Sequence, residues 1–218
     1  MQKIFKTLFI IIFIGQIGGR WLSVPLLDYI FKPLIMPCLA LYLYFSVQGR
    51  LSKFIRFIIV GFVFSWLGDI ALMLEKFNSQ LFLLGLAFFL VAHIFYIVAF
   101  STHIQKPFFQ EKPLLFVPLF LYGISFFYFL YPNLQGFTIP VLLYTIVITT
   151  MAIFALNRKN NVSTQSFKLI FTGALFFVLS DSLIALNKFM LQIPYNGLWV
   201  MLTYMIAQYL IAEGSKQN

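Results

Sequence analysis

Long apolar runs, interrupted only by short polar or basic breaks, cover nearly the whole chain. Each run is long enough to cross a hydrocarbon core of roughly 30 Å as a helix, which takes about 17 to 25 residues. With 61% hydrophobic and only 10% charged residues, the composition is far from that of a soluble domain. The sequence therefore predicts an all-α, polytopic membrane bundle, with residues 1–218 forming a single transmembrane domain.

The breaks divide the chain into eight predicted transmembrane helices. We expect them near residues 4–20, 32–48, 54–74, 80–102, 113–131, 137–156, 168–188 and 196–213. The first follows Lys3 and Lys6, as the apolar part of a signal peptide would, but it lacks a convincing small-x-small cleavage site. We therefore expect it to be retained as the first helix of the bundle.

The Lys and Arg residues are unevenly distributed over the breaks, which predicts the orientation. If the N-terminus is cytoplasmic, eleven of them fall on the cytoplasmic side and four on the other: Arg20, Lys32, Lys76 and Lys188. This bias predicts that both termini are cytoplasmic, in a multi-pass protein of the cell (inner) membrane. The net charge of +9 is then mostly a topology signal with some attraction to anionic headgroups. Nucleic-acid binding is disfavoured because the basic residues are scattered over short loops.

Few residues in the sequence are suited to metal or redox chemistry. The single cysteine, Cys38, excludes an intramolecular disulfide and a thiolate metal cluster, and we expect it to be a small packing residue. Only one of the two histidines, His93, is expected to be buried, so a His-rich zinc site is hard to build, whereas a carboxylate-rich one stays open. We assign no cofactor and no metal ligand. The sequence also lacks a G-x-S-x-G elbow, an H-E-x-x-H motif and a phosphate loop.

Two carboxylates interrupt the apolar spans. Asp69 lies in 62-FVFSWLGDIALML-74 and Asp181 in 174-ALFFVLSDSLIAL-186. An acid inside a membrane costs about 2.5 to 3.5 kcal/mol on insertion scales, so such acids usually face a bundle interior or a wet cavity. At about 1.5 Å per residue, both lie roughly 20 Å from the cytoplasmic face. We expect them to form one site in the outer half of the membrane, with Ser180 beside it; polar clamps between helices are the alternative.

The two stretches around the acids align without a gap at an offset of 112 residues, which pairs Asp69 with Asp181. Gly85 and Gly197, in the helices that follow, keep the same offset. The alignment indicates either a parallel repeat of four plus four helices, with a site at the interface of the halves, or a coincidence in apolar sequence. In either case the two acid-bearing helices run in the same direction.

Other polar side chains within the predicted helices complete the candidate site. Lys32 either extends to the headgroups or enters the cavity as a counter-ion to a carboxylate. His93 and Tyr96 are three residues apart on one helical face, and Tyr204 and Gln208 are four apart on another. For these four residues, substrate positioning and interhelical hydrogen bonding both remain open.

The candidate residues form a series of short motifs along the chain. In order, these are Lys32-Pro33 with Pro37, Gly68-Asp69 with Leu72, Gly85 followed by His93 and Tyr96, Ser180-Asp181, and Tyr204 with Ala207-Gln208. The series resembles the YhhN-like lysoplasmalogenase family of eight-helix membrane hydrolases, and the match spans nearly the whole chain. Members of that family cleave the vinyl-ether bond of lysoplasmalogens. The resemblance implies a lysoplasmalogen substrate among membrane lipids, with Asp69 and Asp181 as the two key aspartates.

Vinyl-ether hydrolysis explains why two acids are needed. A proton must reach the carbon β to the ether oxygen, and water then captures the oxocarbenium ion. One carboxyl group must be protonated and the other ionised, as in the paired carboxylates of glycosidases. The sequence does not tell which aspartate is which. Lys32 is a further candidate for holding the substrate phosphate.

A proton-coupled transporter or permease is the main rival interpretation. It uses intramembrane acids, a histidine and a repeat in the same way. Such proteins often have helices interrupted by Pro or Gly near the site, whereas the stretches around Asp69 and Asp181 contain no proline and only Gly68. A third interpretation, a membrane scaffold without an active site, predicts that Asp→Asn changes leave function intact.

Overall fold

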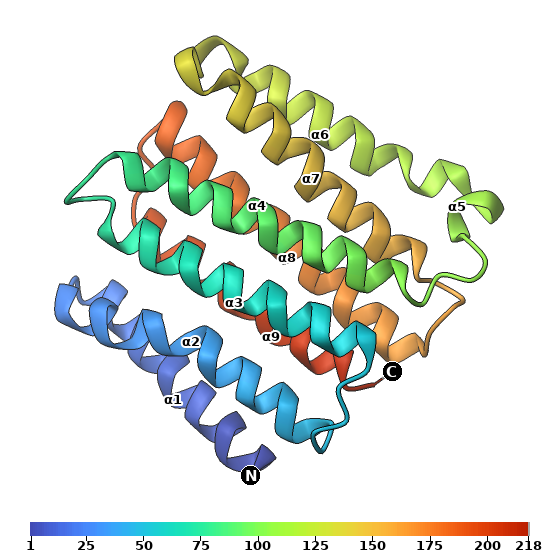
Figure 1. The fold of residues 1–218 in the computed structure, drawn as a ribbon. Coiled ribbons are helices and arrows are strands. Elements are labelled where there is room, and N and C mark those ends of the chain that lie inside the picture. Colours follow the sequence, from blue (N-terminus) through green and yellow to red (C-terminus); the bar gives the residue numbers. More distant parts are fainter. Residues whose placement is uncertain (218) are drawn as a thin grey trace.

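A computed structural model describes residues 1–217, and the regular elements within them are all helical (Figure 1). The long helices in this part of the chain are α1 (Gln2–Trp21), α2 (Pro25–Ser46), α3 (Lys53–Leu74), α4 (Gln80–Ser101), α6 (Val117–Leu130), α7 (Thr138–Asn157), α8 (Thr164–Phe189) and α9 (Asn196–Ser215). Short helical turns connect α4 to α6 and α6 to α7: α5 (Phe108–Glu111), η1 (Pro113–Leu115), η2 (Tyr131–Asn133) and η3 (Gln135–Phe137).

Within residues 1–217, seven helical segments are long and apolar enough to cross a membrane, which confirms the predicted all-helical membrane class. They comprise α1 to α4, α8, and the segments Pro113–Asn133 and Gln135–Asn157, in which short turns extend α6 and α7. The last helix, α9, has 20 residues but is not among these seven segments. The count of eight transmembrane helices therefore stays a prediction.

The second helix begins at Pro25, not at Lys32 as the sequence predicted. The expected boundary was wrong because charged residues were taken to end the apolar run, whereas the charges here have partners inside the fold. Asp28, in the first turn of α2, pairs with Arg20 at a distance of 2.7 Å. Proline at the start of a helix costs nothing, because its missing N–H would have no helical partner there. The connection from α1 is thus reduced to residues 22–24.

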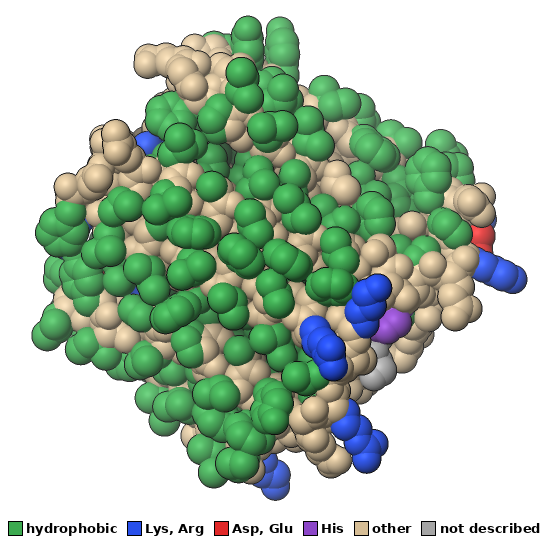
Figure 2. Space-filling model, in the orientation of Figure 1, with side chains coloured by type: hydrophobic (Ala, Val, Ile, Leu, Met, Phe, Trp, Pro, Cys, Tyr) green, Lys and Arg blue, Asp and Glu red, His purple; other side chains and the backbone are tan. Residues whose placement is uncertain are grey.

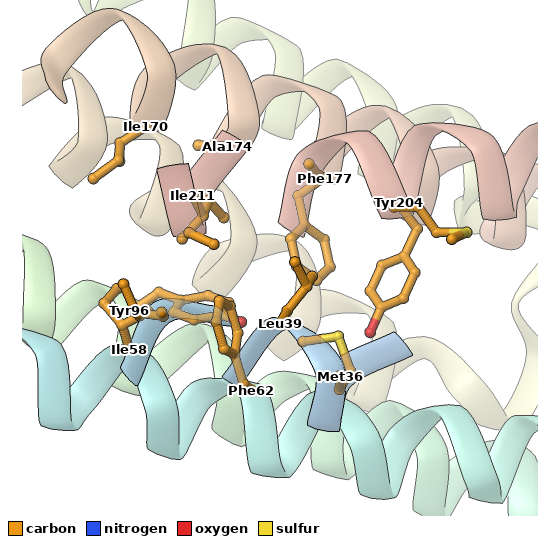
Figure 3. Close-up of a cluster of buried hydrophobic side chains, with 14 of the residues drawn as sticks. Met36, Leu39, Ile58, Phe62, Tyr96, Ile170, Ala174, Phe177, Tyr204 and Ile211 are labelled. Atoms are coloured by element: carbon orange, nitrogen blue, oxygen red, sulfur yellow. The ribbon is translucent and has the colours of Figure 1, made fainter. Parts of the chain in front are cut away.

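The helices pack mainly as antiparallel neighbours in the pairs α1 with α2, α3 with α4, and α8 with α9 (Figure 1). α9 also packs against α1, α2 and α3, while α7 packs against α4 and α8. Side chains from α2, α3, α4, α8 and α9 meet in one hydrophobic core (Figure 3). Both chain ends lie at the same end of the bundle (Figure 1). We call the opposite end, where α1 ends and α9 begins, the loop end.

The outer surface matches the class. Figure 2 shows a face that is largely apolar across the middle of the helices, with most of the visible Lys and Arg side chains toward the end that carries the termini. Many large apolar side chains point outward, among them Ile11, Leu121, Ile139 and Leu179. Contiguous exposed apolar surface of this kind marks a membrane or a partner interface. With seven apolar helices of spanning length, it supports a multi-pass membrane protein.

Candidate active site

Asp69 lies inside the bundle on α3, with a different partner for each carboxylate oxygen. Its Oδ2 accepts a hydrogen bond of 2.7 Å from the hydroxyl of Tyr204 on α9. Its Oδ1 lies 3.8 Å from Nζ of Lys32 on α2, and the side chains of Lys32 and Asp69 are only 7% and 3% exposed. Lys32 therefore points into the bundle and not toward headgroups. An isolated buried charge costs several kcal/mol, so each of these two groups offsets the cost of the other.

Two prolines within α2 help to fix the position of Lys32. Pro37 has no N–H to donate to the carbonyl of Pro33, four residues earlier in the helix. The indole Nε1 of Trp66 on α3 donates to that carbonyl instead, at 2.9 Å. Trp66 precedes Asp69 by three residues, so this bond joins α2 to α3 within one turn of the carboxylate. The freed carbonyl thus becomes an anchor that holds Lys32 beside Asp69.

Asp181 lies on α8 with a different set of partners. Its Oδ2 accepts a hydrogen bond of 2.5 Å from the hydroxyl of Tyr144 on α7, and the same oxygen lies 3.8 Å from Nε2 of His93 on α4. Within residues 1–217 no Lys or Arg forms an ion pair with it. Sequence reasoning missed Tyr144, because a tyrosine in an apolar helix carries no motif of its own.

His93 is completely buried, and in the described chain neither ring nitrogen has a hydrogen-bond partner. The imidazole packs edge-on against Phe177 and Tyr144, with ring centroids 4.6 and 5.4 Å apart. An unpaired buried polar group of this kind is uncommon and often marks a functional position. Across the described residues, no three His, Cys, Asp or Glu side chains gather as a metal site would require.

Tyr96, Gln208 and Ser180 make helix-to-helix hydrogen bonds. Tyr96 donates to Oε1 of Gln208 at 2.8 Å, and Nε2 of Gln208 donates to Oγ of Ser65 at 3.1 Å, which joins α4, α9 and α3. Ser180 donates to the carbonyl of Val200 at 3.2 Å and so joins α8 to α9. Of the two roles that the sequence left open, interhelical hydrogen bonding is the one visible for these three side chains.

Aromatic rings lie between the two acids, which share no hydrogen bond within the described chain. Phe177 packs edge-on against Tyr204 with ring centroids 5.5 Å apart (Figure 3), and it also packs edge-on against His93. The path from one acid to the other therefore runs from Asp69 through Tyr204, Phe177 and His93 to Asp181. The two carboxylates are thus linked through a series of side-chain contacts. They belong to one region of the bundle without forming a direct dyad.

Two glycines allow α3 and α4 to approach each other closely beside the acids. A Cβ atom on Gly68 would lie 2.7 Å from the ring of Phe89, and one on Gly85 would lie 2.7 Å from Leu72. These distances are well inside van der Waals contact, so neither position accepts a larger residue without movement. Gly68 immediately precedes Asp69, and its lack of a side chain lets the Phe89 ring pack against this part of α3.

Two hollows lie beside the acids, one mainly apolar and one polar. The apolar pocket is a cavity of about 60 Å³ between α4, α6, α7 and α8, and Asp181, Tyr144 and Ser182 are among its few polar lining residues. The polar vestibule has a volume of about 340 Å³ at the loop end and is lined by charged residues that include Lys32.

The side chains of Leu72, Phe82 and Ile184 line both hollows and separate them. Leu72 follows Asp69 by three residues, and Ile184 follows Asp181 by three. The boundary between the apolar pocket and the polar vestibule is therefore one helical turn from each acid.

Comparison with known proteins places this site in a family. The model of the YhhN family matches residues 27–215, a range that contains both acids and all of their partners described above. The chain belongs to the YhhN family. The resemblance drawn from the sequence motifs is therefore confirmed, and the paired acids lie in the part of the chain that the YhhN model covers.

Relatives of this YhhN chain include lysoplasmalogenase TMEM86A of Bos taurus and of Homo sapiens, each 36% identical over 165 residues, which is 74% of this chain and 65% of the relative. Lysoplasmalogenase TMEM86B of Mus musculus is 29% identical over 183 residues, 83% of this chain and 72% of the relative. The chain thus spans about 65% of the length of the two TMEM86A relatives. No solved structure matches it.

Proposed function

We propose that this YhhN-family chain is a membrane hydrolase that cleaves the vinyl-ether bond of lysoplasmalogens, giving a fatty aldehyde and a glycerophospho-alcohol. The observation that carries the proposal is the pair of acids inside the bundle with unequal partners, one of which lines a largely apolar pocket. The relatives named lysoplasmalogenase support this substrate class. We place the part of the alkenyl chain next to the vinyl ether at the apolar pocket, beside Asp181, and the remainder of the lipid at the polar vestibule.

Acid and base chemistry at two carboxyl groups completes the reaction. One carboxylic acid gives its proton to the β carbon of the vinyl ether, and the resulting oxocarbenium ion is stabilised by the second, ionised group. Water adds to the cation and loses a proton to a carboxylate, which forms a hemiacetal. The hemiacetal collapses to aldehyde and alcohol, and both carboxyl groups return to their starting states.

The partners of the acids assign these two roles. Asp69 faces the buried ammonium of Lys32 and accepts a hydrogen bond from Tyr204, so its ionised form is the one with matched charge. Asp181 faces the hydroxyl of Tyr144 and an imidazole, with an apolar pocket beside it, so a proton on Asp181 avoids an unpaired buried charge. We therefore assign the proton donor to Asp181 and the stabilising carboxylate to Asp69.

We also propose that the chain is a parallel repeat of four plus four helices. Different residues at equivalent positions of the two halves then produce this asymmetry. The offset of 112 residues that relates Asp69 to Asp181 also relates Lys32 to Tyr144. In support, α2 packs against α9 and, correspondingly, α7 packs against α4. Tyr96 and Gln208, which the same offset pairs, hydrogen-bond to each other, as equivalent residues next to a two-fold axis would. The acid of one half would then have a lysine as its partner, and the acid of the other half a tyrosine.

The orientation belongs to the same proposal: one transmembrane domain of eight helices in the cell membrane, with both termini cytoplasmic. Support comes from the four Lys and Arg residues at the loop end against eleven at the end with the termini. Reporter fusions after residue 218 and within residues 132–136 test it. An extracytoplasmic signal from the C-terminal fusion would invert the assignment and place the acids nearer the inner leaflet.

The activity is tested by incubating detergent-purified protein with a lysoplasmalogen and measuring released aldehyde. The saturated alkyl-ether analogue is the matched control, because protonation at carbon cannot generate an oxocarbenium ion from it. We expect aldehyde from the first substrate and none from the second. Fatty acid released from ordinary lysophospholipid at a comparable rate would contradict the mechanism, since ester cleavage calls for a nucleophile or an oxyanion hole.

A further inference from the structure

The polar vestibule gathers charged side chains that the proposed proton transfers do not use. Arg20, Lys32 and Lys188 line it, so three of the four basic residues at this end of the bundle meet in one hollow. Glu75 is the only acid among its lining residues. Lys32 forms its inner part, and through Lys32 the vestibule adjoins Asp69. The hollow thus gathers three basic side chains, each paired with one acid, and lies next to the candidate active site.

The existing ion pairs leave donors in the vestibule unused. Arg20 binds Asp28 through Nη2 at 2.7 Å, but its buried Nε has no hydrogen-bond partner within residues 1–217. Lys188 pairs with Glu75 at 2.5 Å, its side chain is 35% exposed, and an ammonium has three donors. Asn196, the first residue of α9, also lines the hollow, where the helix N-terminus adds partial positive charge.

We propose that the vestibule is a binding site for the phosphodiester of a lysophospholipid headgroup, with Arg20 and Lys188 as its ligands. The inference rests on the proposed function for its lipid class and extends it to the headgroup. A phosphodiester carries one negative charge and accepts several hydrogen bonds, which suits a guanidinium fork and an ammonium. A glycerol unit joins the phosphate to the vinyl ether, so a phosphate in the vestibule would hold the reacting bond near Leu72 and Ile184, one turn from each acid.

Glu75 makes the proposal distinguishable from a purely structural ion pair. If Lys188 serves only to pair with Glu75, removing either partner has the same consequence. If Lys188 binds phosphate, Lys188→Gln weakens phosphate recognition, while Glu75→Gln frees the ammonium and preserves or strengthens it. Lys76 is the matched control, because it lies at the same end of the bundle but over the Tyr29 ring at 4.5 Å and does not line the vestibule.

The experiment measures equilibrium binding to full-length protein in detergent. The ligands are a radiolabelled 1-alkyl-2-lyso-glycerophosphocholine and 1-alkylglycerol, which lacks the phosphate. We expect the wild-type protein to bind the phosphate-bearing lipid about 10- to 100-fold more tightly, the usual range for hydrogen bonds to a charged group. Lys188→Gln should lower that ratio about tenfold. Lys188→Arg, Glu75→Gln and Lys76→Gln should retain it.

Three results would overturn the proposal: a wild-type ratio near one, equal losses in Lys188→Gln and Glu75→Gln, or an equal loss in Lys76→Gln. Inorganic phosphate as a competitor separates a lipid headgroup site from a free-phosphate site. Displacement of the lipid by millimolar phosphate would assign the vestibule to the free anion and refute the lipid assignment. Because an alkyl ether is not hydrolysed, the outcome of this binding measurement does not depend on whether the protein releases aldehyde from a lysoplasmalogen.

Discussion

Replacing Lys32 by methionine removes the ammonium beside Asp69 while keeping an unbranched side chain of similar length. Lys32 Nζ and Asp69 Oδ1 are 3.8 Å apart, and both side chains are more than nine-tenths buried. Two unit charges at this separation interact by about 4 kcal/mol at an effective dielectric constant of about 20. Removing one partner of a buried pair typically costs about 3 to 5 kcal/mol, because the remaining charge is left without compensation.

A double-mutant cycle separates the pair from the other contacts of each residue. Lys32→Met leaves an unpaired carboxyl, Asp69→Asn leaves an unpaired ammonium, and the double variant leaves neither charge buried. We expect each single variant to lose about 3 kcal/mol or more of unfolding free energy, and the double variant to recover most of this. The measurement is equilibrium unfolding in mixed micelles, followed by tryptophan fluorescence.

Activity should not follow stability in this cycle. Lys32→Met allows Asp69 to take up a proton, so both carboxyl groups are then neutral and no group stabilises the cation. The double variant should therefore refold as well as the wild type and still release no aldehyde. A coupling energy below about 1 kcal/mol, the value typical of exposed pairs, would refute the ion pair and with it the assignment of Asp69 as the ionised group.

The remaining predictions concern the acids, Tyr144 and a histidine outside the spans. Asp69→Asn and Asp181→Asn should each lower turnover by about 10² to 10⁴-fold in monodisperse protein, with the double variant little worse; substantial activity in either removes that acid from the mechanism. Tyr144→Phe deletes the 2.5 Å hydrogen bond to Asp181 and should lower turnover about 10- to 100-fold with an unchanged circular dichroism spectrum. Burial and the Arg158 guanidinium lower the pKa of His103, so the folded state binds that proton less readily and stability should fall as pH drops below about 6.5. His103→Gln should flatten that dependence in thermal unfolding curves, and an unchanged slope would exclude His103 as its source.

Apolar run length was sufficient to predict the helical class but not the helix boundaries. The hydrocarbon thickness fixes how long an apolar helix must be, so α3, α4 and α8 could be anticipated from the runs around Asp69, His93 and Asp181. The start of α2 could not, because a charged residue ends an apolar run only if its charge remains unpaired. Asp28 and Lys32 both have partners from other helices, and such pairs depend on three-dimensional packing.

The candidate site shows the same division between composition and packing. That Asp69 and Asp181 would lie inside the bundle follows from the cost of an acid in lipid. Which oxygen faces which partner does not, because Tyr204 and Lys32 reach Asp69 from helices far away in the sequence. Lys32 was left with two positions from sequence alone, and only the packing of α2 against α3 shows that its ammonium is internal.

Tyr144 is the site residue that sequence reasoning missed, although a signal for it was present. Adding the offset of 112 to Lys32, for which a counter-ion of Asp69 was one of two expected roles, leads to Tyr144, and the structure has Tyr144 bound to Asp181. A repeat relates the partners of an acid as well as the acid itself. If the repeat is real, a lysine in one half and a tyrosine in the other is enough to make two equivalent carboxyl groups chemically different. Such a difference is needed by any reaction that uses one proton donor and one carboxylate.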